Sequence, residues 1–504
     1  MSRKVFRLAI QFSTFVGCIL LSGCGIIGDR LSPSKRDDGG GLISTPFKQG
    51  SSTSLSVNPL NDLDIFLRCY TQLTGNDPEP NDQRIADIKN LKLSGRYACR
   101  QLFKSVALDS NGEVIASTDE KIAIFNRMHR LHSSFFNAKA LLTESNPDFT
   151  KVKENILDPS APALFYTKAL FTLDEPFDNT FKGKRNLTAN RSETLSTPTI
   201  APSTSIFGAN FDQSKYQRVG ELRGISDTPR FEISYNIPAG AYPSSHGNVD
   251  FAGAFGGGII GSPVYLQNNL LPPNYGDGAS QPATSGEWDG GISIGRKWSV
   301  AIFKDFLCQD LPSLEPGDVS APEFVSASTP VPFRNSSACS ACHASMDLLA
   351  GGVRNIGYLP HGVKDAPPGA TSMIGTTELF QLAAGTSALP ELWPLQPDKN
   401  YSIRPPDGIL FFRSSDGSLI SEKFHNLDEL GEIFINQTDT YRCLTKRYMD
   451  YFMGVRIPMK YSTLEENKDL YLAELKRLSL DFKHHRNLNK LVDQVLMSNL
   501  YGSK

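Results

Sequence analysis

The chain has 504 residues, with 51 Lys and Arg against 53 Asp and Glu, so its formal net charge is −2 at pH 7. Balanced charge without a basic stripe gives no reason to expect a nucleic acid as a partner. The length is enough for two or three domains, and a hydrophobic content of 39% with 41 Gly and 32 Pro indicates a loop-rich protein. No membrane span is expected after the N-terminal segment.

Residues 1–23 are typical of a bacterial lipoprotein signal peptide. Basic residues occur within 3–7, and the apolar run 8–21 is too short to span a membrane. The run ends in Leu21-Ser22-Gly23-Cys24, which resembles a lipobox, in which the signal is cut before the cysteine. We therefore expect Cys24 to carry the lipid. The alternative is an ordinary cleaved signal followed by a chance cysteine.

A lipid on Cys24 would anchor the protein to a membrane of the cell envelope. Gly25 stands where an aspartate would suggest retention in the inner membrane. The outer membrane is therefore favoured, with the protein facing the periplasm or the cell surface. Residues 24–60, rich in Ser, Gly, Pro and Lys, are expected to form a flexible tether between the lipid and the folded part.

Residues 61–180 have the pattern of a helical domain. Apolar residues recur at helical spacing in 63–70, in 85–91 and in 121–142. His129 and His132 lie three positions apart in the third of these segments and could bind a metal or haem iron. No acidic cluster joins them, so packing or local capping is the favoured interpretation.

Residues 181–294 are predicted to be a loop-rich connecting region. The part from 182 to 215 is rich in Asn, Ser, Thr and Pro and is expected to be an irregular connection. The glycine-rich stretch 253–261 lacks the Gly-Lys-Ser/Thr ending of a nucleotide-binding loop, so a loop leading into a packed segment at 262–266 is favoured.

The most informative motif is Cys339-Ser340-Ala341-Cys342-His343, which has the C-x-x-C-H spacing of covalent c-type haem attachment. Two thiols three positions apart on a helical turn can form thioethers to the two haem vinyl groups, and the next histidine reaches the iron. The alternatives are a structural disulfide, a thioredoxin-like dithiol or half of a zinc site. The sequence has no βαβ pattern around the motif to support a thioredoxin-like dithiol, and no second Cys-x-x-Cys and no His-x-x-x-His to complete a zinc site.

Residues 295–460 are predicted to form the c-type haem domain. We expect an amphipathic helix at 296–307, a short helix after the motif, a loop-like segment at 356–405, and helices at 427–436 and 440–453. Residues 409–412 and 418–420 are expected to form a small β-hairpin. Helices in 461–504 are expected to pack on this domain. The predicted fold class is mainly α, with helical domains, long irregular loops and a small hairpin near the haem-binding segment.

The four remaining cysteines after the signal are candidates for disulfides in an exported protein. Four cysteines allow three connectivities, and we favour Cys69 with Cys99 and Cys308 with Cys443. The first pair closes a short loop, and the second flanks the haem motif. The alternative is four unpaired buried thiols.

The ligand on the second side of the iron would decide what the haem does. A methionine suits electron transfer, whereas an open position allows ligand binding or peroxide chemistry. Met346 is only one helical turn from His343 and is a poor candidate. We favour Met373 over His361, Met449 and Met453, and expect the last two to pack in the core.

The haem motif with Met346-Asp347, the segment 303–312 and the segment 428–457 resemble a family of uncharacterised exported proteins, the planctomycete-type cytochrome c domain proteins. The resemblance covers residues 295–504 and departs from the family after Asp347, where the chain has Leu348-Leu349-Ala350-Gly351 in place of Pro-x-Gly. It implies haem binding without naming a substrate.

Taken together, the motifs predict an exported, lipid-anchored protein with one covalent haem c, which binds haem and transfers electrons to a redox partner protein. An electron carrier or haem-binding protein is favoured over an enzyme, because a di-haem peroxidase needs a second C-x-x-C-H. The alternative is a surface-anchored binding or scaffold lipoprotein whose Cys339 and Cys342 form a disulfide without haem.

Overall fold

The computed structural model describes residues only from the second of the two units into which the chain divides, Val57–Lys504. The described residues are 60–136, 160–194, 218–229, 256–270, 295–321, 324–325, 335–360, 377–381, 405–459 and 466–503. The predicted signal peptide, Cys24 and nearly all of the predicted tether lie outside the described residues. The predicted domain boundaries at residues 180, 294 and 460 stay predictions.

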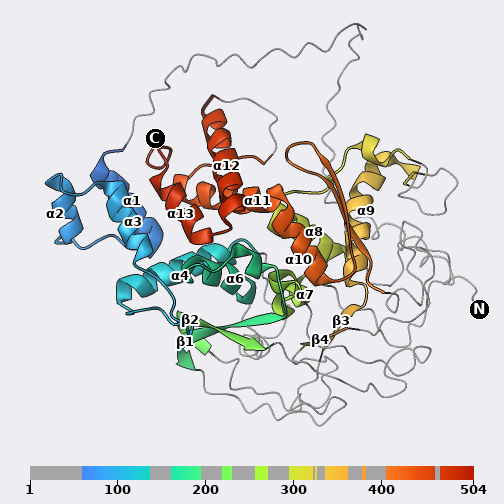
Figure 1. Cartoon of the computed structure of the whole chain (residues 1–504), viewed down its shortest axis with the longest axis horizontal. Helices are drawn as coiled ribbons and strands as arrows, with labels where there is room; N and C mark the ends of the chain where they lie inside the picture. The colour runs from blue at the N-terminus through green and yellow to red at the C-terminus, as the bar shows by residue number, and fades with distance from the viewer. Residues whose placement is uncertain are drawn as a thin grey trace, which may run out of the picture. The chain divides into compact units, whose positions relative to one another are not determined.

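Helices make up 57% of the described residues, so the fold is mainly α. The N-terminal helices are α1 (Asp62–Thr74), α2 (Gln83–Lys89), α3 (Gly95–Lys104), α4 (Asp119–Ser133) and α6 (Ala161–Phe171). The helices that follow in the chain are α7 (Pro263–Asn269), α8 (Arg296–Leu307), α9 (Ser337–Ala350), α10 (Leu427–Asn436), α11 (Thr438–Met453), α12 (Glu466–His485) and α13 (Leu488–Met497) (Figure 1). Short 3-10 helices include η5 (Pro316–Val319) and η7 (Gly351–Val353).

The helix boundaries follow local capping chemistry. The Asn61 side chain accepts a hydrogen bond from the backbone N–H of Asp64 (2.8 Å) and so begins α1. Gly75 ends that helix, and Gly454 ends α11, both in the left-handed region, at φ 84° and 68°. The expected helices at 296–307 and 427–436 agree with α8 and α10.

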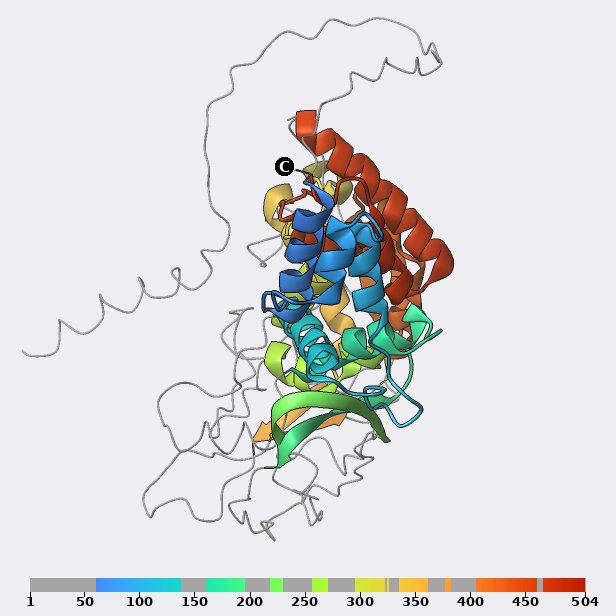
Figure 2. The same cartoon turned by 90° about the vertical axis from the view of Figure 1, so that its left-hand side faces the viewer.

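The described strands form three two-stranded antiparallel sheets. The hairpin of β5 (Gly408–Arg413) and β6 (Leu419–Phe424) agrees with the predicted one. The prediction of an irregular connection at 182–215 is wrong in its first part, where β1 (Arg185–Thr194) pairs with β2 (Arg218–Pro229) (Figure 2). Residues 195–215 lie outside the described residues. The loop prediction at 356–405 is wrong at two places, because β3 (Ile356–Pro360) pairs with β4 (Thr377–Gln381). Residues 361–376 and 382–404 lie outside the described residues.

The sequence conceals β1 because few of its residues are apolar. Only Leu187 and Ala189 supply buried apolar side chains from β1, and they face a partner strand that contributes Leu222 and Ile225. Two apolar residues in a run of Asn, Thr and Arg are too few to show the alternation of apolar and polar residues that marks a β-strand. The strand is held by its ladder of backbone pairs and by polar side-chain contacts, such as the ion pairs of Arg185 with Glu175 and Asp227.

One large hydrophobic core joins helices from both ends of the described chain. It includes Ile65 of α1, Phe171 of α6, Phe306 of α8, Tyr448 of α11 and Val492 of α13. Helix α12 packs along α11, and α13 contacts α3, α6 and α11. No helix among the described residues is long and apolar enough to span a membrane.

The two disulfides in the structure are the two pairs favoured by the sequence. Cys69 of α1 is bonded to Cys99 of α3, with their Cα atoms 5.9 Å apart. Cys308 is bonded to Cys443 of α11, with a Cα–Cα distance of 5.2 Å, and follows the last residue of α8. The second bridge therefore fixes the C-terminal end of α8 to α11.

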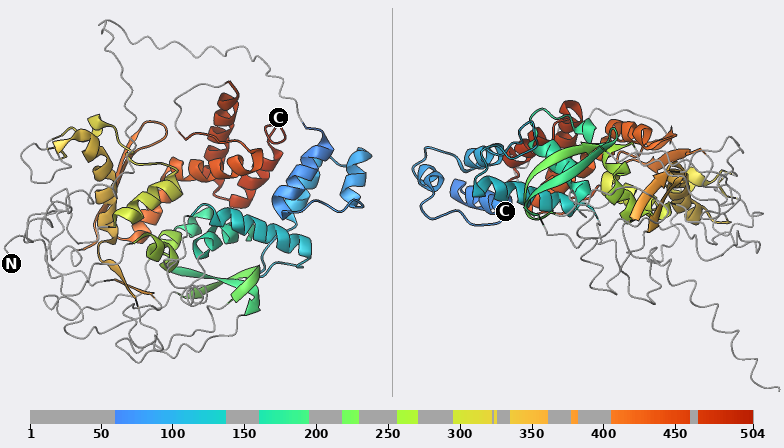
Figure 3. Two further views of the ribbon diagram at one scale, coloured as in Figure 1. Left: turned by 180° about the vertical axis from the view of Figure 1, so that it is seen from behind. Right: turned by 90° about the horizontal axis from the view of Figure 1, so that it is seen from below.

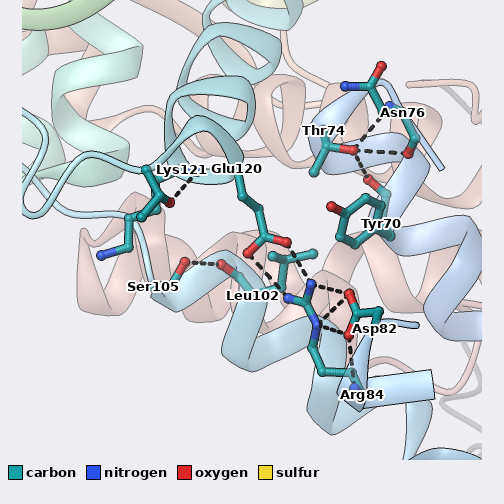
Figure 4. A network of polar contacts seen from close by, with 10 residues as sticks. Tyr70, Thr74, Asn76, Asp82, Arg84, Leu102, Ser105, Glu120 and Lys121 are labelled. Carbon is teal, nitrogen blue, oxygen red and sulfur yellow. Dashed lines mark hydrogen bonds and ion pairs between the residues drawn. The ribbon is translucent and has the colours of Figure 1, made fainter. Parts of the chain in front are cut away.

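A polar cluster connects α2 to the start of α4 (Figure 4). The Arg84 guanidinium pairs with Asp82 at 2.5 Å and with Glu120 at 2.6 Å. It also lies over the rings of Phe66 and Tyr70, at 5.4 and 5.3 Å from their centroids. This arrangement is a structural clamp between helices, because these four partners come from α1, the N-terminal cap of α2 and the first turn of α4.

Candidate functional site

Helix α9 carries the Cys-x-x-Cys-His motif within a single α-helix. Cys339 is exposed, Cys342 is partly buried, and the His343 side chain is 22% exposed. Because residues three and four apart share a helix face, these three side chains lie along one edge of α9. Both cysteines lie outside the two disulfides described above.

The opposite face of α9 is buried and lined by small residues. Ala341 and Ala344 pack against Leu314, Val319 of η5 and Phe411 of β5. Small side chains let the helix backbone come close to the strand, which places α9 beside the β5–β6 hairpin (Figure 1). The burial of this face leaves the motif edge as the accessible one.

Buried hydroxyl groups fix the rotation of α9 about its own axis. The Ser345 and Ser313 hydroxyls are 2.7 Å apart, and the Ser340 hydroxyl donates to the Phe324 carbonyl oxygen at 3.1 Å. Ser340 and Ser345 are fully buried, so a rotated helix would leave these hydroxyls without these partners. The rotation of α9 sets where Cys339, Cys342 and His343 stand.

Two glycines allow the chain to leave α9 against the hairpin. A Cβ atom on Gly352 would lie 2.1 Å from the Phe424 ring, and one on Gly351 would lie 2.3 Å from the Asp407 carbonyl oxygen. A side chain at either position would therefore have to displace the Phe424 ring or the backbone at Asp407. The Gly351-Gly352 pair therefore seats the end of the motif helix on β5 and β6.

His343 is held by a buried carboxylate one helical turn further along α9. Its Nδ1 lies 3.1 Å from Oδ2 of Asp347, whose side chain is only 1% exposed. Arg296, in the first turn of α8, donates from Nε to Oδ1 at 2.6 Å and from Nη2 to Oδ2 at 3.0 Å. Helices α8 and α9 lie side by side (Figure 3), and the Arg296–Asp347 contact joins them.

The charge state of Asp347 follows from these partners. Burial raises the pKa of this carboxyl, but the hydrogen bond from His343 and the charge of Arg296 outweigh burial and hold its pKa below the ordinary value of 3.8. Asp347 is therefore an ionised acceptor at neutral pH. An ionised acceptor at Nδ1 favours the histidine tautomer that carries its proton there.

The residues of this site fit a covalently attached haem. Cys339 and Cys342 supply two thiols at the required spacing, and His343 supplies an imidazole. With Nδ1 bonded to Asp347, Nε2 is the ring nitrogen that would bind the iron. Among the described residues, no group of three or more His, Cys, Asp and Glu side chains could hold a metal ion. That finding concerns sites with three or more protein ligands, whereas haem iron takes only one or two ligands from the protein and the porphyrin supplies the other four.

The candidates for the second axial ligand divide between described and undescribed residues. Met373 and His361 lie outside the described residues, so the preference for Met373 stays a prediction. Met449 and Met453 of α11 are 0% and 4% exposed and belong to the main hydrophobic core. Their placement agrees with the expected packing role.

The histidine pair of α4 has a structural explanation. His132 is fully buried, with Nδ1 2.8 Å from the Thr167 hydroxyl and Nε2 2.6 Å from the Tyr448 hydroxyl. Burial, together with the neighbouring His129, holds the pKa of His132 well below its ordinary value, so the ring is neutral. Both ring nitrogens of His132 are thus used in the core, which agrees with the packing interpretation.

The sequence alone locates the three motif residues but not their supporting pair. Asp347 follows His343 by four positions, which is the spacing of facing side chains on a helix and could have indicated the contact. Arg296 precedes Asp347 by 51 positions, and no local pattern predicts that pairing.

Comparison with protein-family models, with curated proteins and with solved structures gave no match to this chain. The resemblance to planctomycete-type cytochrome c domain proteins therefore stays a prediction.

Proposed function

We propose that this chain is an exported, lipid-anchored c-type cytochrome that binds one haem and transfers electrons. Cys339 and Cys342 would hold the haem through thioethers, and Nε2 of His343 would be an axial ligand of the iron. The haem supplies reversible one-electron chemistry when bound. The observation that supports this most strongly is the hydrogen bond between Nδ1 of His343 and the buried Asp347 carboxylate. Histidines that ligate metals typically donate their other ring N–H to such an acceptor.

Two further observations are consistent with an exported haem protein. The disulfides Cys69–Cys99 and Cys308–Cys443 are of a kind that persists in oxidising compartments, which is where c-type haem is attached. The motif edge of α9 is accessible, with Cys339 exposed, so haem attachment needs no displacement of the buried face.

The experiment is expression with its signal in a bacterial host that has c-type cytochrome maturation machinery. A denaturing gel stained for haem peroxidase activity should show a band that retains haem, with a c-type pyridine haemochrome spectrum. Cys342→Ala should lose most of this covalent haem. Met346→Ala changes a partly buried residue of the same helix and should retain it, which makes it the matched control. A wild-type protein without haem would contradict the proposal and favour the disulfide-bearing scaffold lipoprotein.

We propose further that Cys24 carries the lipid and anchors the protein to the cell envelope, with the outer membrane favoured. The support is the lipobox-like sequence at 21–24. Cys24→Ser should release the protein from the membrane fraction and abolish the incorporation of labelled palmitate. Retention of label in Cys24→Ser would contradict this assignment.

The preferred second axial ligand is Met373. A methionine ligand produces a weak sulfur-to-iron absorption band near the red edge of the visible spectrum of the ferric protein. We expect this band in the wild type and its loss in Met373→Ala, with Met449→Leu as the control that keeps the band. Persistence of the band in Met373→Ala would exclude Met373.

A further inference from the structure

The ion pair between Arg296 and Asp347 also includes His343, which a pair that only joins two helices does not require. Oδ2 of Asp347 accepts hydrogen bonds from both Nη2 of Arg296 (3.0 Å) and Nδ1 of His343 (3.1 Å). The same carboxylate oxygen therefore links the guanidinium to the imidazole. A pair that served only to join α8 to α9 would not need the histidine within hydrogen-bond distance.

The carboxylate is fixed from two sides. A buried carboxylate destabilises a fold unless it is paired with a positive charge and hydrogen-bonded. The bidentate contact from Arg296 provides both the charge and the hydrogen bonds, and it sets the plane of the carboxyl group. Arg296 lies at the start of α8, and the Cys308–Cys443 bridge holds the other end of that helix. Asp347 thus presents a rigid acceptor to His343.

We propose that Asp347, oriented by Arg296, is a positioning residue that fixes the imidazole of His343 and lowers the reduction potential of the haem. This inference rests on the proposed function, because it needs haem iron on Nε2 of His343. A carboxylate that accepts the Nδ1 proton makes an imidazole a more basic ligand. A more basic axial ligand stabilises ferric over ferrous iron, and hydrogen bonding to the ligand is a recognised means of tuning the potential.

The test is a redox titration of the full-length protein with dye mediators, in which haem content is measured in the same samples. Asp347→Asn keeps the shape of the side chain and removes its charge. We expect the equilibrium between ferric and ferrous haem to shift at least tenfold towards ferrous, which for one electron is a rise of about 59 mV. Asp347→Glu restores the carboxylate and should recover part of the shift.

Asp305→Asn is the matched control. It removes a different buried carboxylate, which lies on α8 and accepts a hydrogen bond from Tyr265. Asp305 is nine residues beyond Arg296, or about 13 Å along the helix. Its effect on the equilibrium should be much smaller than that of Asp347→Asn. An equal shift in both variants would show a general charge effect and overturn the positioning role.

Two outcomes separate this inference from the proposed function. Full haem content with the same potential in wild type and Asp347→Asn overturns the inference and leaves the proposed function intact. A wild type that carries no haem overturns both.

A measurement on the unaltered protein covers the case in which Asp347→Asn does not fold. Photolysis of the carbon monoxide complex leaves five-coordinate ferrous haem, whose iron–histidine stretching frequency reports the strength of the hydrogen bond at Nδ1. A frequency raised above that of a histidine bonded to a neutral carbonyl would support the inference. A frequency at or below that reference would contradict it.

Discussion

Asp305 of α8 is a second buried carboxylate, with partners different from those of Asp347. Its Oδ2 accepts a hydrogen bond from the Tyr265 hydroxyl at 3.2 Å, and the residue is 4% exposed. Burial raises the pKa of Asp305 to about 6, although the charge of Arg447 and the hydrogen bond from Tyr265 oppose the rise. The charged form is therefore less favourable in the folded protein than in the unfolded chain.

This shift predicts how Asp305 affects stability with pH. The pKa of Asp305 rises from 3.8 in the unfolded chain to about 6 in the fold. The protonated carboxyl therefore stabilises the fold below pH 3.8, and this stabilisation is lost as the pH rises through about 6. Asp305→Asn removes this titration. Near neutral pH the variant should be more stable than the wild type by about 3 kcal/mol, and the difference should vanish near pH 4.

Urea unfolding of both proteins across this pH range, with the disulfides intact, measures the difference directly. A difference in the free energy of unfolding that does not change with pH would contradict the assigned pKa of Asp305.

The role of a residue can be predicted from the sequence when the residues that it works with are close to it along the chain. His343 and its two cysteines form a contiguous motif, so their residue types and spacing alone indicate the chemistry. Arg296 could not be predicted, because its role depends on the packing of α8 against α9. The same holds for the ring contacts of His132, which come from α6 and α11.

At the scale of elements, the two disulfides connect helices over very different lengths of chain. Cys69–Cys99 closes a separation of 30 residues, and Cys308–Cys443 closes one of 135. In the chain-entropy model the cost of losing a disulfide grows with the loop that it closes. The second disulfide also holds α8, and therefore Arg296, to α11.

Replacing both cysteines of a pair with alanine should lower the free energy of unfolding by roughly 3–4 kcal/mol for Cys69–Cys99 and by about 5 kcal/mol for Cys308–Cys443. Urea unfolding without reductant tests the order. Peptide mapping of the wild type without reductant serves as the control for connectivity. A larger loss from the shorter loop, or peptides that join Cys69 to Cys308, would contradict this account.

Elements with strong periodicity were predictable, and elements with few apolar residues were not. The β5–β6 hairpin has consecutive buried residues in β5 and a Ser-Ser-Asp-Gly turn, so its pattern was visible. Strand β3 carries a proline at its last position, Pro360, which is opposite Thr377 of β4. A proline in a short run ordinarily argues against a strand, so the loop expectation failed there.

At the scale of the whole described chain, the first helix and the last residues are joined. The backbone N–H of Leu60 donates to the Gly502 carbonyl oxygen at 2.8 Å. The fully buried Tyr501 donates from its hydroxyl to Gln72 of α1 at 2.9 Å, and the Arg68 guanidinium lies 5.6 Å from the centre of its ring. The sequence could not predict this closure, because the partners are more than 400 positions apart.

Tyr501→Ala should therefore destabilise the fold strongly, by about 3–5 kcal/mol, as expected for the loss of a large aromatic side chain from a core. The matched control is Tyr97→Ala, because Tyr97 is 46% exposed and its truncation should change stability by about 0.5 kcal/mol or less. Thermal or urea unfolding compares the two variants. Similar effects in both would argue that Tyr501 does not connect the ends of the fold.

The central claim, that this helical fold carries covalent haem, is tested most directly by the mass of one tryptic peptide. Cleavage after Arg334 and Arg354 releases residues 335–354, which contain Cys339, Cys342 and His343. In protein matured with its signal, this peptide should have the mass of its sequence plus one haem. A peptide with the sequence mass alone, or with the loss of two hydrogens that marks a Cys339–Cys342 disulfide, would contradict the claim.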